Sequence, residues 1–302
     1  MVSEQTKSTA DSIKNYIKQN GIEYRTLFDL LDVAKTAFEK ENDTEWALKV
    51  TSYIKECCTW AIQNSIEVLQ MDELYWKTLK VEAPYWFDSY LIYLERKRER
   101  RDMFYLPKRK QLNKHGLIQA MQDLEDDKLD ILSISMPPGT QKTTLEKFFA
   151  SWIIGRHPDD YSLFFSHSGD ITRMFYDGVI DITTNDEEYC WNEIFPDVHL
   201  VSTDAKREQI NFNKYKPFAN LQCTSVGSKN AGKVRCNRYL YCDDLIGGIE
   251  EALNKNQLDK LWRIYGTDAK QRKLNEQVKE IHIATRWSVH DVIGRLKRLY
   301  AG

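Results

Sequence analysis

In the first quarter of the chain, apolar residues recur every three to four positions, which is the spacing of one face of an α-helix. The first of three such stripes ends at Asn20 and Gly21, where a glycine can cap a helix, and the second ends at residues 41–43. The stripes are Ile13, Tyr16 and Ile17; Leu27, Phe28, Leu30, Leu31, Ala34, Ala37 and Phe38; and Trp46, Val50, Tyr53, Ile54, Cys57, Ala61 and Ile62. We therefore predict that residues 1–75 form a helical N-terminal appendage, suited at most to partner docking.

Further along, the pattern changes to short apolar runs that alternate with helical stripes. Continuous runs occupy residues 131–136, 161–167, 239–242 and 278–284, and we predict the first, second and last of them as buried strands. Helical spacing is found at residues 112–124, 145–153 and 171–182 and begins again at 288. Residues 184–200 are predicted to be irregular, and residues 207–213 and 220–226 to form a hairpin or edge strands.

Strands that alternate with helices are typical of a mainly parallel sheet. We predict for residues 76–302 an α/β domain with a mainly parallel twisted sheet flanked by helices. The composition agrees with a globular protein, since 42% of the 302 residues are apolar and 29% are charged.

The net charge of −2 excludes a global basic field, so any contact with nucleic acid must come from a local patch. The 6 cysteines show no Cys-x-x-Cys spacing, which indicates neither a disulfide framework nor a zinc site. Cys242 lies in an apolar run and is expected to be buried. Neither a signal peptide nor a long uncharged apolar stretch is found, so a cytosolic protein is expected.

Basic residues outnumber acids over residues 95–114. Because the acids are interleaved, a solvated helix face is the favoured interpretation, and a patch that faces phosphates is the other. Within this segment, Tyr105 and Gln111 could frame an adenine ring by stacking and hydrogen bonding. An ordinary loop that pins the following helix explains residues 104–111 equally well.

The loop after the first strand carries a phosphate-binding pattern. It contains Pro137, Pro138, Gly139, Thr140 and Gln141, and a helical stripe begins after Lys142, Thr143 and Thr144. A strand, a tight loop, a Lys-Thr pair and a helix form the layout of a P-loop, whose lysine reaches the β- and γ-phosphates and whose hydroxyl holds Mg²⁺. Met136 and Gln141 stand where that pattern has glycines, so a buried strand followed by a plain turn is an equal alternative for this stretch alone.

Two later strands also end in polar residues. The run at 239–242 leads into Asp243 and Asp244, and the run at 278–284 leads into Thr285. Ligands bind beyond the carboxyl ends of parallel strands, so one acid can hold Mg²⁺ while the next orients and deprotonates water. A strand that ends in acidic turn residues is the plain alternative. The position of the acid pair in a βα-alternating chain that contains the lysine loop favours a nucleotide site.

Together these motifs resemble those of the large (motor) subunit of tailed-bacteriophage terminases, the ATPases that pump DNA into procapsids. Order and spacing agree over roughly residues 100–302. The matching segments are residues 105–109, 136–143, 155–158, 232–235, 239–244 and 285–296. The last is the most specific, because Thr-Arg-Trp with a downstream Asp and Gly-Arg is rare among P-loop ATPases.

The resemblance implies a P-loop NTPase fold and a Mg²⁺-dependent ATPase. It implies that Thr143 and Asp243 hold the metal, that Asp244 is the catalytic base, and that Thr285 belongs to the motif that couples hydrolysis to movement. Arg235 would act as an arginine finger on the nucleotide of a neighbouring subunit. The implied nucleotide-binding residues are Tyr105, Arg109, Gln111, Pro138, Gly139, Thr140, Gln141, Lys142, Thr143 and Thr144.

The resemblance also implies the cofactors and partners. ATP and Mg²⁺ would be the cofactors, and hydrolysis would drive translocation of double-stranded viral DNA into the procapsid. The portal protein and the small terminase subunit would be partners, with a homo-oligomeric ring when assembled, a monomer when alone, and the host cytoplasm as the location. We expect the C-terminal nuclease domain of the family to be absent from this chain, and with it nuclease activity.

Two departures from the family pattern are Gln141, in place of the usual glycine, and Ser288, where histidine is common. Met136 and Gln141 suggest the first alternative function, a degenerate P-loop that binds nucleotide or a partner without turnover. The second alternative is a helicase-like translocase of the same ATPase superclass, which would separate strands rather than pull intact duplex.

Overall fold

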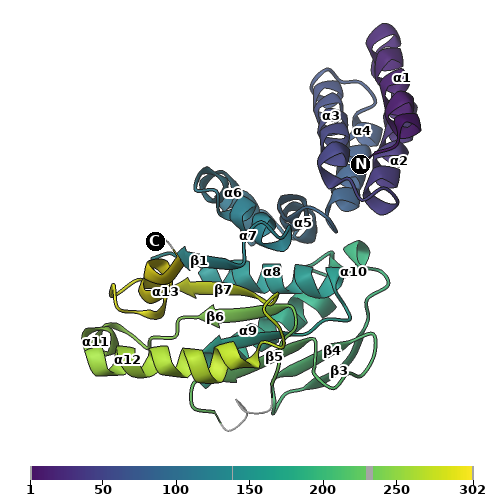
Figure 1. The fold of residues 1–302 in the computed structure, drawn as a ribbon. Coiled ribbons are helices and arrows are strands. Elements are labelled where there is room, and N and C mark those ends of the chain that lie inside the picture. Colours follow the sequence, from purple (N-terminus) through teal and green to yellow (C-terminus); the bar gives the residue numbers. More distant parts are fainter. Residues whose placement is uncertain (1, 138, 229–233, 301–302) are drawn as a thin grey trace. The chain divides into compact units, whose positions relative to one another are not determined.

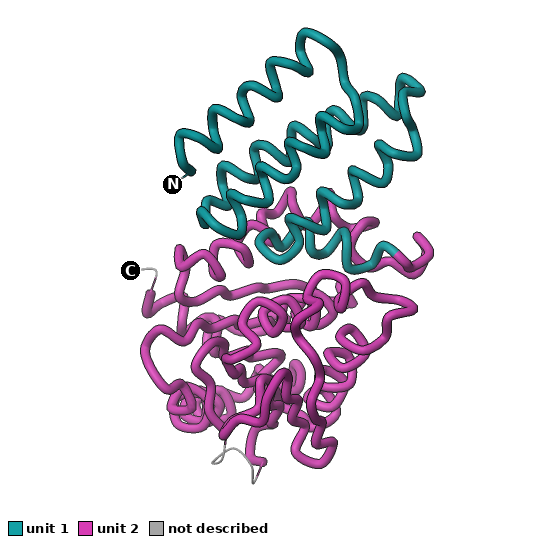
Figure 2. The backbone as a smooth tube through the Cα atoms, turned by 90° about the vertical axis from the view of Figure 1, so that its right-hand side faces the viewer, with its two compact units in different colours: residues 1–96 teal, residues 97–302 magenta. Residues whose placement is uncertain are grey.

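The computed structural model describes residues 2–137, 139–228 and 234–300, and the chain divides into two compact units, residues 1–96 (unit 1) and 97–302 (unit 2) (Figure 2). This boundary differs from the predicted one after residue 75. Position 75 lies inside the helix α4, Val68–Glu82, whose Met71 and Leu74 belong to the core of the preceding helices. Because α4 is continuous across residue 75, the predicted boundary is wrong, and unit 1 includes the whole of α4 and the segment up to residue 96.

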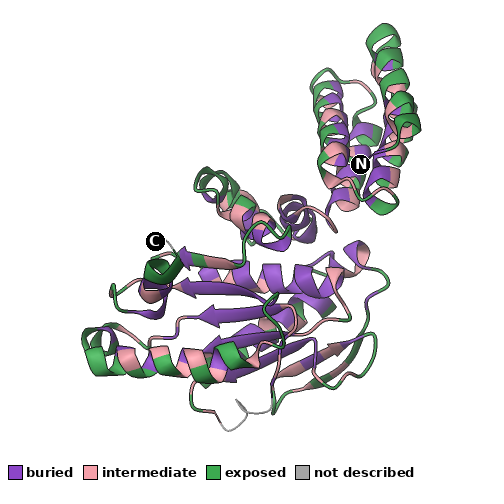
Figure 3. Ribbon diagram, viewed as in Figure 1, coloured by how far each residue is buried: buried purple, intermediate pink, exposed green. Residues whose placement is uncertain are grey.

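The described part of unit 1 is helical, as predicted. Its helices are α1 (Glu4–Asn20), α2 (Tyr24–Glu39), α3 (Thr44–Gln63), α4 and α5 (Phe87–Leu94). Gly21 ends α1 with a φ of 100°, a value that favours glycine, and its N–H donates to the carbonyl of Ile17. The buried faces of α1 to α4 share one core, which includes Leu27, Leu30, Leu31, Val50, Ile54, Met71 and Leu74 (Figure 3).

Unit 2 contains a seven-stranded sheet in the order β1-β7-β6-β2-β5-β4-β3 (Figure 1). The strands are β1 (Ile131–Ser135), β2 (Ser162–Ser166), β3 (Leu200–Asp204), β4 (Gln209–Phe212), β5 (Leu221–Ser225), β6 (Tyr239–Asp243) and β7 (Lys279–Ala284). The five strands from β1 to β5 in this order pair in parallel, and β4 and β3 pair antiparallel. The predicted α/β fold with a mainly parallel sheet flanked by helices is confirmed.

Helices cover both faces of the sheet. On one face lie α8 (Lys142–Arg156) and α9 (Gly169–Thr184): Phe149 of α8 contacts Tyr239 at 5.4 Å between ring centroids, and Phe175 of α9 stacks on Phe164 at 3.8 Å. The other face packs against α12 (Lys255–Ile264), the π-helical turn Tyr265–Ala269 and α13 (Val292–Tyr300). Since both faces are buried, the central strands have continuous apolar runs.

The shorter elements of unit 2 are α6 (Tyr105–Lys114), α7 (Leu117–Glu125), α10 (Trp191–Ile194), α11 (Ile249–Leu253) and the 3₁₀ turn Lys270–Arg272. The helix predicted over residues 112–124 is therefore two helices, and most of the segment 104–111 is α6 rather than a loop. The break lies at Gly116, whose φ of 66° is in the left-handed region and ends the helical geometry.

Two strands differ from their predictions in burial. β1 was predicted to be a buried strand, but it is the first strand in the sheet order, and Ile134 is its one buried residue. β5 was predicted to belong to a hairpin or an edge. It pairs antiparallel with β4, as the hairpin alternative predicted, but it is not an edge strand: it lies between β2 and β4, and four of its five residues are buried. Strand order depends on contacts distant in sequence, so the local pattern could not give it. Strand β3 was not predicted.

All six cysteines have free thiols and are buried, and Cys242 is 2% exposed, as predicted for that residue. Among the helices of the described residues, none combines the length and the apolarity that a membrane crossing requires.

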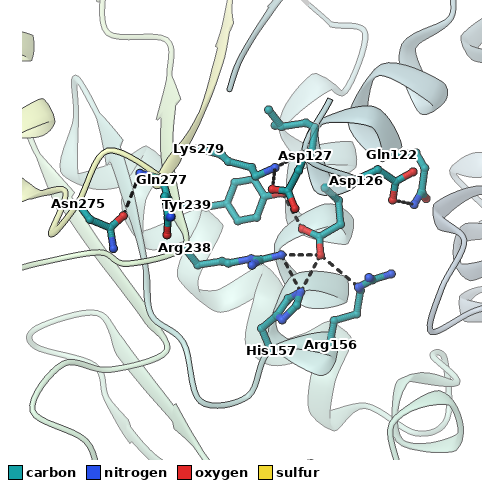
Figure 4. Close-up of polar contacts among 12 residues, drawn as sticks. Gln122, Asp126, Asp127, Arg156, His157, Arg238, Tyr239, Asn275, Gln277 and Lys279 are labelled. Carbon is teal, nitrogen blue, oxygen red and sulfur yellow. Dashed lines mark hydrogen bonds and ion pairs between the residues drawn. The ribbon is translucent and has the colours of Figure 1, made fainter. Parts of the chain in front are cut away.

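A buried ion cluster joins α7, α8 and β6 at the amino ends of the strands (Figure 4). Glu125 is 4% exposed, and its Oε1 lies 2.8 Å from Arg238 Nη2, 2.6 Å from His157 Nε2 and 3.3 Å from Arg156 Nε. Its Oε2 accepts the hydroxyl of Tyr239 at 2.8 Å. Burial by itself raises the pKa of Glu125, but the surrounding histidine and arginines outweigh it and lower this pKa to about 2.

This cluster predicts a loss of stability in acid. Because the pKa of Glu125 is lower in the folded chain than in the unfolded chain, its contribution is complete above about pH 4.5 and is lost as the pH falls toward 2. The shift corresponds to about 3 kcal/mol. Urea unfolding between pH 7 and pH 3 should show this decline in wild type, and Glu125→Gln should lower stability at pH 7 and remove that part of the decline. Parallel curves for the two proteins would contradict the prediction.

Candidate functional site

Three adjacent parallel strands, β1, β7 and β6, end at the same edge of the sheet, and a polar segment follows each. The register pairs Ser135 with Ala284 and Ile283 with Asp243, so the strands end side by side. We call this edge the carboxyl edge. The loop after β1, the acids at the end of β6 and Thr285 after β7 therefore begin at neighbouring points, as the sequence predicted for one sheet edge.

Lys142, the first residue of α8, connects these three points. Its side chain is almost buried, and its Nζ lies 2.6 Å from Asp244 Oδ2 and donates to Thr285 Oγ1 at 3.0 Å. The Thr285 hydroxyl in turn donates to the backbone oxygen of Met136 at 3.3 Å. One ammonium group thus holds together segments that are up to 143 residues apart in sequence.

Thr143 and Asp243 form a second contact beside the first. The Thr143 hydroxyl donates to Asp243 Oδ2 at 2.8 Å, whereas Asp243 Oδ1 is buried and has no partner among the described residues. Burial raises the pKa of Asp243 to about 6, against the lowering effect of the Thr143 hydroxyl, and the charge of Asp244 adds to the rise. The carboxylate is thus a charged group that lacks its full set of partners.

Hydrogen bonds to its backbone and to its side chain fix the position of Asp244. Its φ of 39° is unusual for a residue other than glycine, and its N–H donates to the carbonyl of Ile283 at 2.8 Å. Its Oδ1 accepts the N–H of Thr285 at 3.0 Å, and its carbonyl oxygen contacts the ring Nδ1 of His167. The sequence prediction did not single out His167. Its position directly after β2, at the carboxyl edge, is the signal that could have identified it.

The loop between β1 and α8 turns twice through left-handed backbone. Gly139 has a φ of 77° and Gln141 a φ of 60°, and the Thr140 hydroxyl donates to the carbonyl of Pro137 at 2.8 Å. The Gln141 side chain accepts a hydrogen bond from Lys108 of α6. Gln141 gives α8 no side-chain cap. The N–H of Thr144 donates to the backbone carbonyl of Gln141 at 3.0 Å, and the N–H groups of Lys142 and Thr143 lie at the helix N-terminus, where anions bind. Thr144 is in the first turn of α8, and Pro138 lies outside the described residues.

A cavity of about 600 Å³ adjoins this loop, and α6, α7 and β1 enclose it. Its volume is within the range of small-molecule sites. Gln111, Met136, Gly139 and Thr140 line it. Of the other nucleotide-binding residues predicted on α6, Arg109 does not line it, and Tyr105 has no exposed surface. Tyr105 is one of the two buried residues of α6, so its ring is covered and cannot stack on a base.

Arg235 lies away from this site. It precedes β6, whose opposite end carries Asp243, and its Nη1 donates to the carbonyl of Val234 at 2.8 Å. The length of β6, at about 3.3 Å per residue, separates the two ends. The structure therefore brings together Lys142, Thr143, Asp243, Asp244 and Thr285 but not Arg235 of the same chain. Gly232, from the motif of Arg235, lies outside the described residues.

Hydrogen bonds also fix the segment after Thr285. Arg286 Nε lies 3.0 Å from Asp291 Oδ2, and Asp291 Oδ1 accepts the N–H of Gly294 at 2.7 Å. A Cβ atom on Gly294 would lie 2.3 Å from the carbonyl oxygen of Val289, so this position requires glycine. Arg286 and the Asp-x-x-Gly part of the last motif therefore build one tight turn next to Thr285.

A second residue that the sequence prediction did not assign is Glu146, one helical turn after Thr143. It is fully buried, and burial, together with the charges of Asp243 and Asp244, raises its pKa well above the usual range for a glutamate. An acid within an apolar helical stripe is the sequence signal that could have identified it.

No protein-family model matches this chain, and a search of curated proteins finds no match either. The class of site is therefore defined by its geometry. A helix N-terminus, a lysine, a Thr–Asp pair and a second Asp meet at the carboxyl edge of an α/β sheet.

The left-handed backbone at Gln141 predicts an effect on stability. Gln141→Gly and Gln141→Ala both remove the contact with Lys108, but only alanine keeps a Cβ at a φ of 60°. The glycine variant should be more stable than the alanine variant by about 1 kcal/mol, the cost of a left-handed residue that is not glycine. Urea unfolding of the two variants measures this difference. An alanine variant at least as stable as the glycine variant would show that the loop has another backbone conformation.

Proposed function

We propose that this chain hydrolyses a nucleoside triphosphate, ATP in the first instance, with Mg²⁺, at the carboxyl edge of the sheet. The observation that carries the proposal is the contact of Lys142 with both Asp244 and Thr285, next to the contact of Thr143 with Asp243. These are the residue types that a P-loop NTPase uses for phosphate, metal and water.

Each residue has a distinct role in the proposal. The N–H groups at the start of α8 and the ammonium of Lys142 bind the β- and γ-phosphates, which draw Lys142 away from its partners. Asp244, released from Lys142, accepts a proton from the attacking water. The N–H of Thr285 and the ring of His167 keep the Asp244 carboxylate and backbone in place for that step.

The residues present fit Mg²⁺. No group of three or more His, Cys, Asp or Glu in the described residues is arranged to hold a metal by itself. Magnesium sites of this class use few protein ligands, since phosphates and waters supply the rest. Thr143 and Asp243 would hold the ion, and the buried Asp243 Oδ1 without a partner is an oxygen that a cation would satisfy. When bound, Mg²⁺ neutralises charge on the phosphates.

We further propose that hydrolysis drives translocation of double-stranded DNA. The resemblance to the terminase motor subunit supports this, together with the turn that Arg286, Asp291 and Gly294 build beside Thr285. The partners would be the portal protein and the small terminase subunit, in a homo-oligomeric ring. Arg235 would act across the interface, and mixed rings of Arg235→Ala and Asp244→Ala chains would then recover turnover.

The second candidate function is nucleotide binding without turnover. Gln141 favours it, because its side chain stands in place of a glycine hydrogen and contacts Lys108. Its backbone nevertheless has the left-handed φ that a glycine would adopt, so the turn itself is kept.

Steady-state release of phosphate from ATP, with and without double-stranded DNA, separates the two candidates. Wild type should release phosphate with Mg²⁺, and Lys142→Ala and Asp244→Ala should each lower kcat by at least about 100-fold, because each removes charge that the transition state needs. Asp177→Asn, a change in an exposed ion pair of α9, is the control and should leave kcat unchanged. Equal rates for wild type and the two site variants would leave only binding.

A further inference from the structure

Glu146 differs from the other buried glutamates of unit 2. Glu125 and Glu280 each have a partner for both carboxylate oxygens; those of Glu280 are Lys273, Tyr265 and His282. Glu146 is 0% exposed, and neither of its oxygens has a hydrogen-bond partner. Among the carboxylates of the described residues it is the one with both oxygens buried and unpaired. A buried carboxylate without partners is costly, so its presence requires an explanation.

The residues around Glu146 indicate that its carboxylate lies near the carboxyl edge. Thr143 precedes it by three residues on α8, so the two side chains lie on the same side of the helix. α8 covers the sheet face to which Tyr239, Tyr241 and Asp243 point, because residues two apart in a strand share a face. The charged groups that act most strongly on Glu146 are Asp243, then Asp244, then Lys142.

Two more buried oxygens without partners are found at this level of the sheet. Asp243 is 1% exposed and has an unpaired Oδ1, and Ser166, which pairs with Asp243 in the register of β2 and β6, has an unpaired hydroxyl. These unpaired oxygens, like the unpaired hydroxyl of Tyr241, therefore lie on the sheet face that α8 covers. No cation among the described side chains is bonded to them, although Lys142 and Lys147 are near.

We propose that Glu146 is part of the divalent-cation site, so that two buried carboxylates, Glu146 and Asp243, serve the cation together with the hydroxyl of Thr143. The proposal rests on the metal site of the proposed function and extends it. A divalent cation, with the waters that Mg²⁺ keeps, supplies the positive charge and the hydrogen-bond donors that the unpaired oxygens lack.

Two consequences separate this site from one built on Asp243 and Thr143 alone. A pair of carboxylates can hold a divalent cation before any nucleotide arrives, whereas one carboxylate and a hydroxyl depend on the phosphates. The apo chain should also be less stable than it could be, because the unpaired carboxylate remains buried until the cation binds.

Binding of Mn²⁺ to the full chain without nucleotide tests the proposal, by electron paramagnetic resonance or calorimetry. Wild type should bind Mn²⁺, and Glu146→Gln should weaken this binding by about 10- to 100-fold, the usual effect of removing a group that supports a metal site. Asp177→Asn is the control for lost surface charge and should keep the wild-type affinity. Lys142→Ala should bind Mn²⁺ at least as tightly as wild type, because it removes a competing cation.

A melting experiment distinguishes a metal role from a structural one. In the presence of a chelator, Glu146→Met should have a higher Tm than wild type, and added Mn²⁺ should raise the Tm of wild type but not of the variant. If Glu146 served only the packing, Glu146→Gln and Glu146→Met would both lower the Tm and leave Mn²⁺ affinity unchanged, which would overturn the proposal. Absence of Mn²⁺ binding to wild type would overturn it too.

Failure of the proposed function would look different. If the chain binds Mn²⁺ through Glu146 but neither binds nor hydrolyses ATP, the cation site is supported and the proposed ATPase is contradicted. If wild type hydrolyses ATP and has the same Mn²⁺ affinity as Glu146→Gln, the ATPase is supported and the role of Glu146 in the cation site is contradicted.

Discussion

The contact of Lys142 with Asp244 and Thr285 is the interaction on which the candidate site depends. An ammonium that is almost buried must have partners, and here the partners come from the ends of two different strands, β6 and β7, while Lys142 itself follows the third, β1. A phosphate could break the ion pair between Lys142 and Asp244, because an anion at the start of α8 would compete with Asp244 for the lysine. The charges of Lys142 and Asp244 therefore stabilise the chain without a ligand, and the same lysine is the group that would bind a phosphate.

Buried carboxylates have partners at one end of the sheet and lack them at the other. At the amino ends, Glu125 is surrounded by His157 and two arginines, and its low pKa reports a fully compensated charge. At the carboxyl edge, Asp243 and Glu146 keep unpaired oxygens, and burial raises both of their pKa values. The first arrangement stabilises the fold. The unpaired oxygens of the second arrangement lower the stability of the fold, which is expected at a site that a cation completes.

The sequence was sufficient to predict the alternation of strands and helices, the helical first unit and the meeting of Lys142, Asp243, Asp244 and Thr285. These follow from local spacing and from the rule that parallel strands end at one edge. It was not sufficient for the order of strands, which made β1 an edge strand and β5 an interior one. Nor could it show that Tyr105 is buried or that Glu146 lacks partners, because both depend on packing between helices and strands distant in sequence.

The most direct test of the central claim is a calorimetric titration of the full chain with a non-hydrolysable ATP analogue, with Mg²⁺ and with a chelator. We predict saturable binding of one analogue per chain, tighter with Mg²⁺ than without it, and a loss of most of that affinity in Lys142→Ala. No heat of binding in wild type, or the same affinity in wild type and Lys142→Ala, would contradict the assignment of the carboxyl edge as a triphosphate site.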